Sequence, residues 1–149
     1  MRAVVQRVSK ASVTVDSQVI GEIQKGLLVL VGIKADDTEK DMEYIINKIQ
    51  GLRIFEDEDG KMNISVKDIM GSILIVPNFT LYGDARKGAR PSFMASGSIE
   101  EAEKKYEMFI KKLKLAYDLV ETGEFQADMQ VELLNDGPVT ILLDSEKLF

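Results

Sequence analysis

The chain has 149 residues, the length of one ordinary domain and enough to bury a core without disulfides or metals. It has no cysteine and no histidine, which excludes disulfides, thiolate chemistry, an imidazole base, a Ser-His triad and histidine-ligated zinc. The net charge of −6 argues against a general nucleic-acid binder, which carries an excess of basic surface. Any hydrolysis must therefore use carboxylates, hydroxyls, lysines, backbone groups or the substrate itself.

The first ten residues, MRAVVQRVSK, interrupt their apolar positions with charges, unlike a signal peptide. No apolar run approaches the roughly 18 residues that a transmembrane helix needs. We therefore expect a cytoplasmic protein with no membrane partner.

The first third of the chain predicts strands. Residues Met1–Val8 and Ala11–Val15 alternate apolar and polar side chains with the period of two that is typical of strands. The run Gly26–Ile33, GLLVLVGI, is short and nearly all apolar, which predicts a strand buried on both faces. The inner positions of a hairpin that turns at Asp16–Gln18 are expected to be Val13, Val15, Val19 and Ile23.

Two helices are predicted, each preceded by a capping box, in which a hydroxyl residue is followed three positions later by an acidic one. A helix over Glu39–Gly51 follows Thr38, and a helix over Ile99–Ala116 follows Ser98. The outer face of the second helix is rich in lysine, and such faces are usually only solvated, although a supporting contact with RNA phosphates is the alternative. These lysines are Lys104, Lys105, Lys111, Lys112 and Lys114.

The remaining strands complete the predicted fold. Ile73–Val76 is one, and Gln130–Leu134 and Val139–Leu143 are two more, which flank a turn at Asn135–Pro138. Strands open and close the chain and two helices are interposed. This order predicts a single α+β domain over residues 1–149 with a mostly antiparallel sheet and two main helices.

Two segments look unlike core sequence. The segment Asn78–Phe93, NFTLYGDARKGARPSF, sets the hydroxyl of Thr80 just after an apolar strand and then continues into a basic turn. The segment Asn135–Thr140, NDGPVT, offers a rigid backbone edge with few side chains. A polar pocket beside basic residues suits a site that reads a small group attached to a polyanion. The basic residues of the turn are Arg86, Lys87 and Arg90.

These segments resemble the signature motifs of the D-aminoacyl-tRNA deacylases, small dimeric editing enzymes that hydrolyse D-amino acids from mischarged tRNA. The resemblance begins with MRAVVQRV at residues 1–8, continues through GLLVLVG at residues 26–32 and extends beyond Gly137-Pro138. It implies a barrel-like sheet and a homodimer that acts on aminoacylated tRNA without a cofactor or metal. DNA is not expected among its partners.

The resemblance also implies roles for individual residues. In these enzymes the Gly-Pro bond, here Gly137-Pro138, is cis and enters the active site of the partner subunit, where its carbonyls occupy the place of an L side chain. The enzyme then selects D-amino acids by rejecting L-amino acids, and glycine is not rejected because it has no side chain. Arg7 is expected to hold this loop, and its alternative role is that of a surface arginine at a strand end. The basic turn is expected to contact phosphates near the acceptor end of the tRNA.

The catalytic group is expected among Asn78, Phe79 and Thr80. A threonine nucleophile needs an adjacent base, and no histidine exists to serve. Asn78 and Phe79 suit pocket walls, and backbone N–H groups near Phe79 and Thr80 suit an oxyanion hole. We favour hydrolysis assisted by the 2′-hydroxyl of the substrate over a covalent role for Thr80, and both remain open.

The chain departs from the family pattern at two places. Pro77-Asn78 stands where most members carry Ser-Gln, and Gln126 stands where glycine is usual. A related deacylase group has proline at that position and a trans Gly-Pro bond, so both isomers of Gly137-Pro138 remain open. Two rival functions are a non-catalytic RNA- or ligand-binding domain, and a metal hydrolase that uses Asp84, Asp128 and Asp136.

Overall fold

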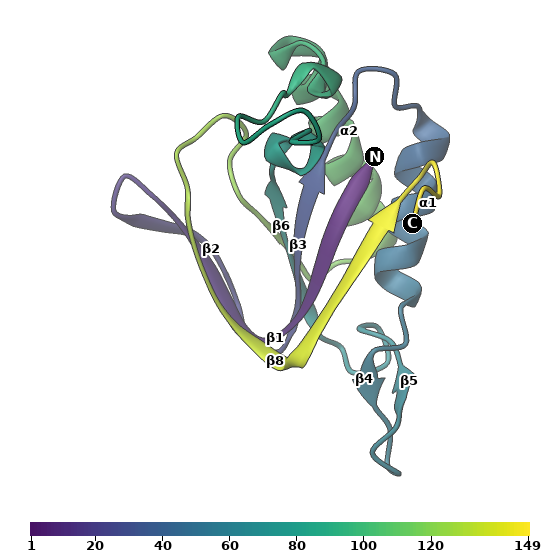
Figure 1. Ribbon diagram of the computed structural model, residues 1–149. Helices are drawn as coiled ribbons and strands as arrows, with labels where there is room; N and C mark the ends of the chain where they lie inside the picture. The colour runs from purple at the N-terminus through teal and green to yellow at the C-terminus, as the bar shows by residue number, and fades with distance from the viewer.

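A long central strand, β1 (Arg2–Val15), organises the sheet in the computed structural model, which describes residues 1–149. It pairs antiparallel with β2 (Gln18–Ile23), β3 (Gly26–Gly32) and β8 (Gln130–Asp144). Figure 1 shows β1 and β8 bending together, so that the sheet curls into a nearly closed barrel. The predicted α+β fold with a barrel-like sheet is confirmed.

Beyond β3 the neighbouring strands of the sheet run parallel to one another. β3 pairs with β6 (Ser72–Pro77), and β6 pairs with the short strand β7 (Val120–Thr122). A separate hairpin of β4 (Phe55–Glu56) and β5 (Met62–Ile64) extends from the end of the first helix. The acidic turn of residues 56–60 lies at the tip of this hairpin, where its side chains are mostly solvated.

The two helices lie where the capping boxes predicted them. α1 spans Glu39–Gly51 behind the capping box of Thr38, and α2 spans Ile99–Ala116 behind the N-cap Ser98, whose hydroxyl accepts the Glu101 N–H. Two turns of 3-10 helix, η1 (Phe79–Tyr82) and η2 (Met94–Ser96), precede α2. No helix has the length and apolar character to cross a membrane.

The core has two layers because β3 and β6 are buried on both faces, as the apolar run of β3 predicted. One face packs against α1 and α2, and its cluster includes Leu27, Val29 and Phe109. The other face lies inside the curl of the sheet, where a smaller cluster includes Leu28 and Leu74. Alternate residues of one strand therefore serve different clusters.

Two expectations for the strands were wrong. Residues Met1–Val8 and Ala11–Val15 belong to one continuous strand, because β8 pairs along β1 from Arg2 to Thr14 through bulges rather than breaks. Val19 is not an inner residue of the hairpin, since 59% of it is exposed. The register shift after Val13 leaves Ile20 unpaired, and this extra residue interrupts the alternation of buried positions.

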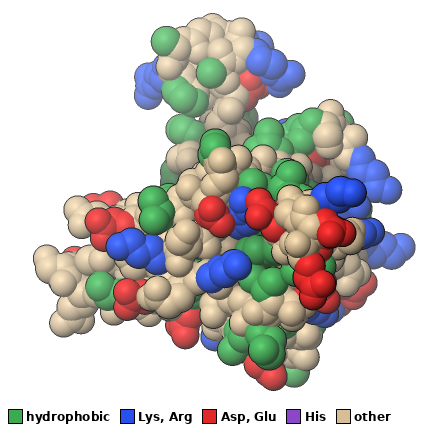
Figure 2. Space-filling view, turned by 90° about the horizontal axis from the view of Figure 1, so that it is seen from below, with side chains coloured by type: hydrophobic (Ala, Val, Ile, Leu, Met, Phe, Trp, Pro, Cys, Tyr) green, Lys and Arg blue, Asp and Glu red, His purple; other side chains and the backbone are tan.

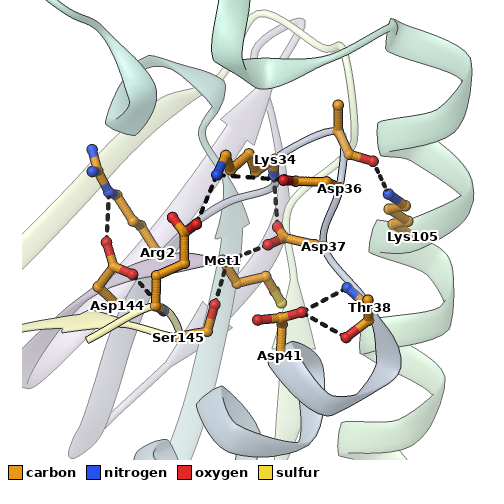
Figure 3. A network of polar contacts seen from close by, with 12 residues as sticks. Met1, Arg2, Lys34, Asp36, Asp37, Thr38, Asp41, Lys105, Asp144 and Ser145 are labelled. Atoms are coloured by element: carbon orange, nitrogen blue, oxygen red, sulfur yellow. Dashed lines mark hydrogen bonds and ion pairs between the residues drawn. The ribbon is translucent and has the colours of Figure 1, made fainter. Parts of the chain in front are cut away.

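The N-terminal ammonium group ties β1 to the loop before α1 and to the end of β8 (Figure 3). It donates to the carboxylate of Asp37 and, over 2.7 Å, to Ser145 Oγ. Burial raises the pKa of Asp37 above its usual value, against the lowering effect of the ammonium. Burial would also raise the pKa of Asp41, but hydrogen bonds from Thr38 lower it to about 2.

Candidate functional site

A cavity of about 780 Å³ lies beside the smaller core cluster. Its walls come from the ends of β3 and β6, from η1 and η2, from the first turn of α2, and from residues 125–131. Apolar side chains form much of the wall, as in most small-molecule sites. The three predicted residues Asn78, Phe79 and Thr80 all line it.

Asn78 shapes the turn that carries this motif. Its backbone N–H donates to Val31 O over 2.8 Å, which extends the pairing of β6 with β3 by one residue. Its side-chain Oδ1 accepts the N–H of Thr80 at 3.2 Å and the hydroxyl of Thr80 at 2.5 Å. Asn78 is thus the N-cap of η1, and the Thr80 hydroxyl proton points to an amide oxygen rather than to a base.

Phe79 forms an aromatic wall with a residue that sequence reasoning missed. Phe79 is 58% exposed, and its ring meets that of Phe93 edge to face, with 5.2 Å between the centroids. The carbonyl of Phe79 accepts a hydrogen bond from Ser96 Oγ at 3.3 Å, so η2 holds η1 in place. The Phe79 N–H is the first of its 3-10 turn and has no intrahelical acceptor, which leaves it available to a ligand.

The departures from the family pattern also lie at the cavity. Pro77 ends β6 and lines the wall, where the adjacent Asn78 N–H makes the hydrogen bond to β3. Gln126 lines the mouth with φ +64°, a left-handed conformation that glycine adopts without cost. Gln126 therefore keeps the backbone shape that a glycine would favour there and adds a side chain at the rim.

The carboxylates of the metal-hydrolase hypothesis do not gather. Asp128 lines the cavity as its one ionisable side chain, Asp84 is paired with Arg86, and Asp136 is paired with Arg7. No group of three His, Cys, Asp or Glu residues in the structure is placed to hold a metal ion.

Gly137 and Pro138 lie in a bulge within β8 and not in a turn between two strands, so that expectation was wrong. Asn135 is paired with Val8 and Thr140 with Gln6, so the intervening four residues of β8 face a single residue of β1. The β1–β8 ladder resumes beyond the bulge, which keeps the strand continuous. The Gly137-Pro138 bond is cis, and neither residue lines the cavity of this chain.

Arg7 is buried beneath this bulge, so the alternative of a surface arginine is wrong. Only 6% of it is exposed. Its Nη1 donates to Ile54 O at 2.7 Å, and its Nε donates to Asp136 O at 3.1 Å. The Asp136 carboxylate lies 3.3 Å from the same Nε. Arg7 therefore links the bulge to the segment that follows α1.

The basic turn forms a closed loop apart from the cavity. Backbone hydrogen bonds in both directions between Asp84 and Ser92 close its base. Asp84 accepts two hydrogen bonds from the Arg86 guanidinium, at 2.9 and 2.7 Å, and these hold the pKa of Asp84 well below its usual value. The exposed charges of Lys87 and Arg90 have no such partner.

Some of the positive charge outside the basic turn is paired with carboxylates. On α2, Lys104 pairs with Glu100, and Lys112 pairs with acidic residues of α1. Lys105 donates to the carbonyl of Ala35. Figure 2 shows Lys and Arg interspersed with Asp and Glu over the body of the molecule. A contact with a polyanion would therefore be local. Lys111 and Lys114 of α2 have no ion-pair partner, as Lys87 and Arg90 of the basic turn have none.

Comparisons with known proteins give the family. The family model described as D-Tyr-tRNA(Tyr) deacylase matches residues 4–144. Proteins named D-aminoacyl-tRNA deacylase are 60% identical in Thermosipho melanesiensis and 58% identical in Thermotoga petrophila, and each match covers 100% of both chains.

Solved structures agree on the fold. One titled c-Myc DNA Unwinding Element Binding Protein is 46% identical, with a TM-score of 0.92 over 97% of this chain and 98% of that one. One titled a probable eukaryotic D-amino acid tRNA deacylase is 16% identical, with a TM-score of 0.82 over 95% and 97%, and shows the shared fold alone. By the family model and the full-length relatives, this chain belongs to the D-Tyr-tRNA(Tyr) deacylase family.

Proposed function

We propose that this protein hydrolyses the ester bond of D-aminoacyl-tRNA, and of glycyl-tRNA mischarged on tRNA-Ala, and releases the free amino acid and tRNA. The observation that carries the proposal is the cavity beside η1, which holds the family motif but offers no side-chain base within hydrogen-bond reach of the Thr80 hydroxyl. The names of the full-length relatives support the substrate class.

The chemistry then rests on orientation. An aminoacyl-tRNA ester is activated and has a 2′-hydroxyl beside it, so a site that positions the carbonyl and a water gains much of its rate by alignment. The Phe79 N–H, which has no intrahelical acceptor, is suited to stabilise the oxyanion. The exposed rings of Phe79 and Phe93 are suited to flank the apolar parts of the ligand.

We further propose that the protein works as a homodimer. The bulge with Gly137 and Pro138 is held rigidly but does not line the cavity of its own chain, so it is available to the cavity of a second copy. The carbonyls of the bulge would then exclude L side chains. Apolar side chains exposed on β8 offer a surface for self-association, namely Leu133, Leu134 and Leu142.

The first test is whether the protein cleaves at all. Purified protein should release free amino acid from D-aminoacyl-tRNA in a single turnover, and a chelator should leave the rate unchanged because the carboxylates do not gather at the cavity. A non-catalytic RNA-binding domain on the same fold would bind the tRNA and leave the ester intact. Loss of the rate with chelator would instead favour the metal hydrolase.

Thr80 should be dispensable as a nucleophile. Its hydroxyl donates to Asn78 Oδ1 and has no base, so Thr80→Ala and Thr80→Val should keep the rate of single-turnover deacylation within about tenfold of the wild type. A small loss is expected, because the hydroxyl contributes to the N-cap of η1. Trapping of an acyl group on Thr80 by rapid quench and mass spectrometry would contradict this mechanism.

The basic turn should supply tRNA affinity. Replacing Arg86, Lys87 and Arg90 together with alanine should weaken tRNA binding and flatten its dependence on salt, since fewer counterions are released. The melting temperature should change little, because exposed charges contribute little to stability. A matched control replaces Lys104, Lys111 and Lys114 of α2, which should affect binding less. An unchanged affinity and salt slope in the basic-turn variant would show that tRNA binds elsewhere.

A further inference from the structure

The side chain of Asn135 spans the bulge of β8. Its Oδ1 accepts the N–H of Val139 at 3.1 Å, and its Nδ2 donates to the carbonyl of Val139 at 3.0 Å. The same Nδ2 lies 3.3 Å from the carbonyl of Arg7 on β1. One amide thus joins the residue before the bulge to its last residue and to the neighbouring strand.

Arg7 secures the opposite end of the same bulge. Its Nε donates to the carbonyl of Asp136, and its Nη1 donates to Ile54 O in the buried segment after α1. The hydrogen bonds of Asn135 and those of Arg7 are connected, because the backbone carbonyl of Arg7 is itself an acceptor for Asn135. Between these two sets of contacts, Gly137 and Pro138 are held at both ends and remain exposed.

We infer that Asn135 is a positioning residue that fixes the conformation of the Gly137-Pro138 bulge and, through it, the rejection of L-amino acids. The second half of this inference rests on the proposed function, and the first half does not. The bulge interrupts the β1–β8 register, so Asp136–Val139 have no paired residue on β1. An asparagine amide can hold such a segment because it both accepts and donates hydrogen bonds.

The chemistry of the side chain makes the inference testable. Asn135→Asp keeps an acceptor for the Val139 N–H and loses both donations from Nδ2. Asn135→Ala loses all three contacts. The matched control is Asn47→Ala on the exposed face of α1, which removes an amide far from β8 along the chain.

The first measurement is amide hydrogen exchange at Val139, followed by NMR, which needs no substrate. Asn135→Ala should raise the exchange rate about tenfold or more over the wild type, with Asn135→Asp between the two and Asn47→Ala unchanged. Wild-type exchange at Val139 in Asn135→Ala would overturn the inference.

The second measurement compares deacylation of L-alanyl-tRNA with that of D-alanyl-tRNA. Asn135→Ala should raise the L rate about tenfold or more and leave the D rate within about threefold, which a general loss of folding would not do. Two outcomes for Asn135→Ala would overturn the positioning role. One is an equal fall in the L and D rates. The other is an unchanged rejection of the L substrate although exchange at Val139 is fast. A wild type that cleaves neither substrate would refute the proposed function, and the exchange measurement would still decide whether Asn135 fixes the bulge.

Discussion

The Gly137→Ala variant should lose much of its ability to reject L-aminoacyl-tRNA. Gly137 has a φ of +128°, a backbone conformation that residues with an L side chain rarely adopt. An added Cβ would lie 2.7 Å from Val139 Cγ2 and 2.9 Å from Arg7 Nη2. Gly137 must therefore move relative to the side chains of Val139 and Arg7, and Arg7 is one of the two residues that hold the bulge. We expect hydrolysis of L-alanyl-tRNA to rise by about tenfold or more, measured in single turnover.

The control for this variant is Gly60→Ala in the turn between β4 and β5. Gly60 also has a positive φ, of +73°, but a Cβ there would meet nothing within 4 Å. Both variants should lose about 1–3 kcal/mol of unfolding free energy from the strained backbone. Only Gly137→Ala should change the ratio of L to D cleavage. An unchanged ratio in a folded Gly137→Ala dimer would contradict a role for the bulge in rejection.

A dimer that combines one Ala127→Trp subunit with one Gly137→Ala subunit should regain the rejection of L-aminoacyl-tRNA that the Gly137→Ala homodimer loses. Ala127→Trp places a bulky ring in the cavity and should inactivate its own site by about 100-fold, whereas Gly137→Ala alters only the bulge. If the protein forms the proposed dimer, then with one subunit of each kind the open cavity faces the unaltered bulge of its partner. This dimer should therefore reject L-alanyl-tRNA as the wild type does, at about half the wild-type D rate, which follows if its two sites act independently.

The mixed dimer is isolated with two affinity tags, and its L and D rates are compared with those of both parent homodimers. If the bulge acted on the cavity of its own chain, the mixed dimer would cleave L-alanyl-tRNA as readily per open site as the Gly137→Ala homodimer. That result would refute action across the subunit interface.

Local signals in the sequence located the helices to the residue. Both α1 and α2 begin after a capping box, and their apolar stripes face the larger core cluster. These features depend on residues three or four positions apart, so the sequence alone carries them. The Asp16–Ser17 turn is also local, since both residues adopt positive φ at the tip of the β1–β2 hairpin.

Long-range pairing was beyond the sequence. The Gly-Pro dipeptide of β8 reads as a reverse turn, but β1 continues past it and pairs on both sides, which makes it a bulge. Arg7 is buried at the same face of β1 as Ala3 and Val5, but its charge made a surface position the ordinary expectation. The family resemblance pointed to Arg7 and the bulge, whereas residue spacing alone offered only a turn and a surface arginine.

The candidate site was predicted in part. Asn78, Phe79 and Thr80 line one cavity, because a single short turn carries all three. Phe93 ends the same segment but was given no role, and Asp128 was named only as a candidate metal ligand, since only tertiary packing shows that both line this cavity. Asn135 was assigned to a turn without a role, although the side chain of an asparagine in a turn often hydrogen-bonds to the nearby backbone.

The central claim is that a backbone bulge selects substrates by shape, so that the presence of an L side chain decides cleavage whatever its chemistry. The most direct measurement compares D-alanyl, glycyl and L-alanyl esters of one tRNA under single-turnover conditions. The D-alanyl and glycyl esters should be cleaved, and the L-alanyl ester should be slower by about 100-fold or more, because packed backbone would have to move to admit one methyl group. Comparable cleavage of the L-alanyl ester would contradict the account and leave a general esterase.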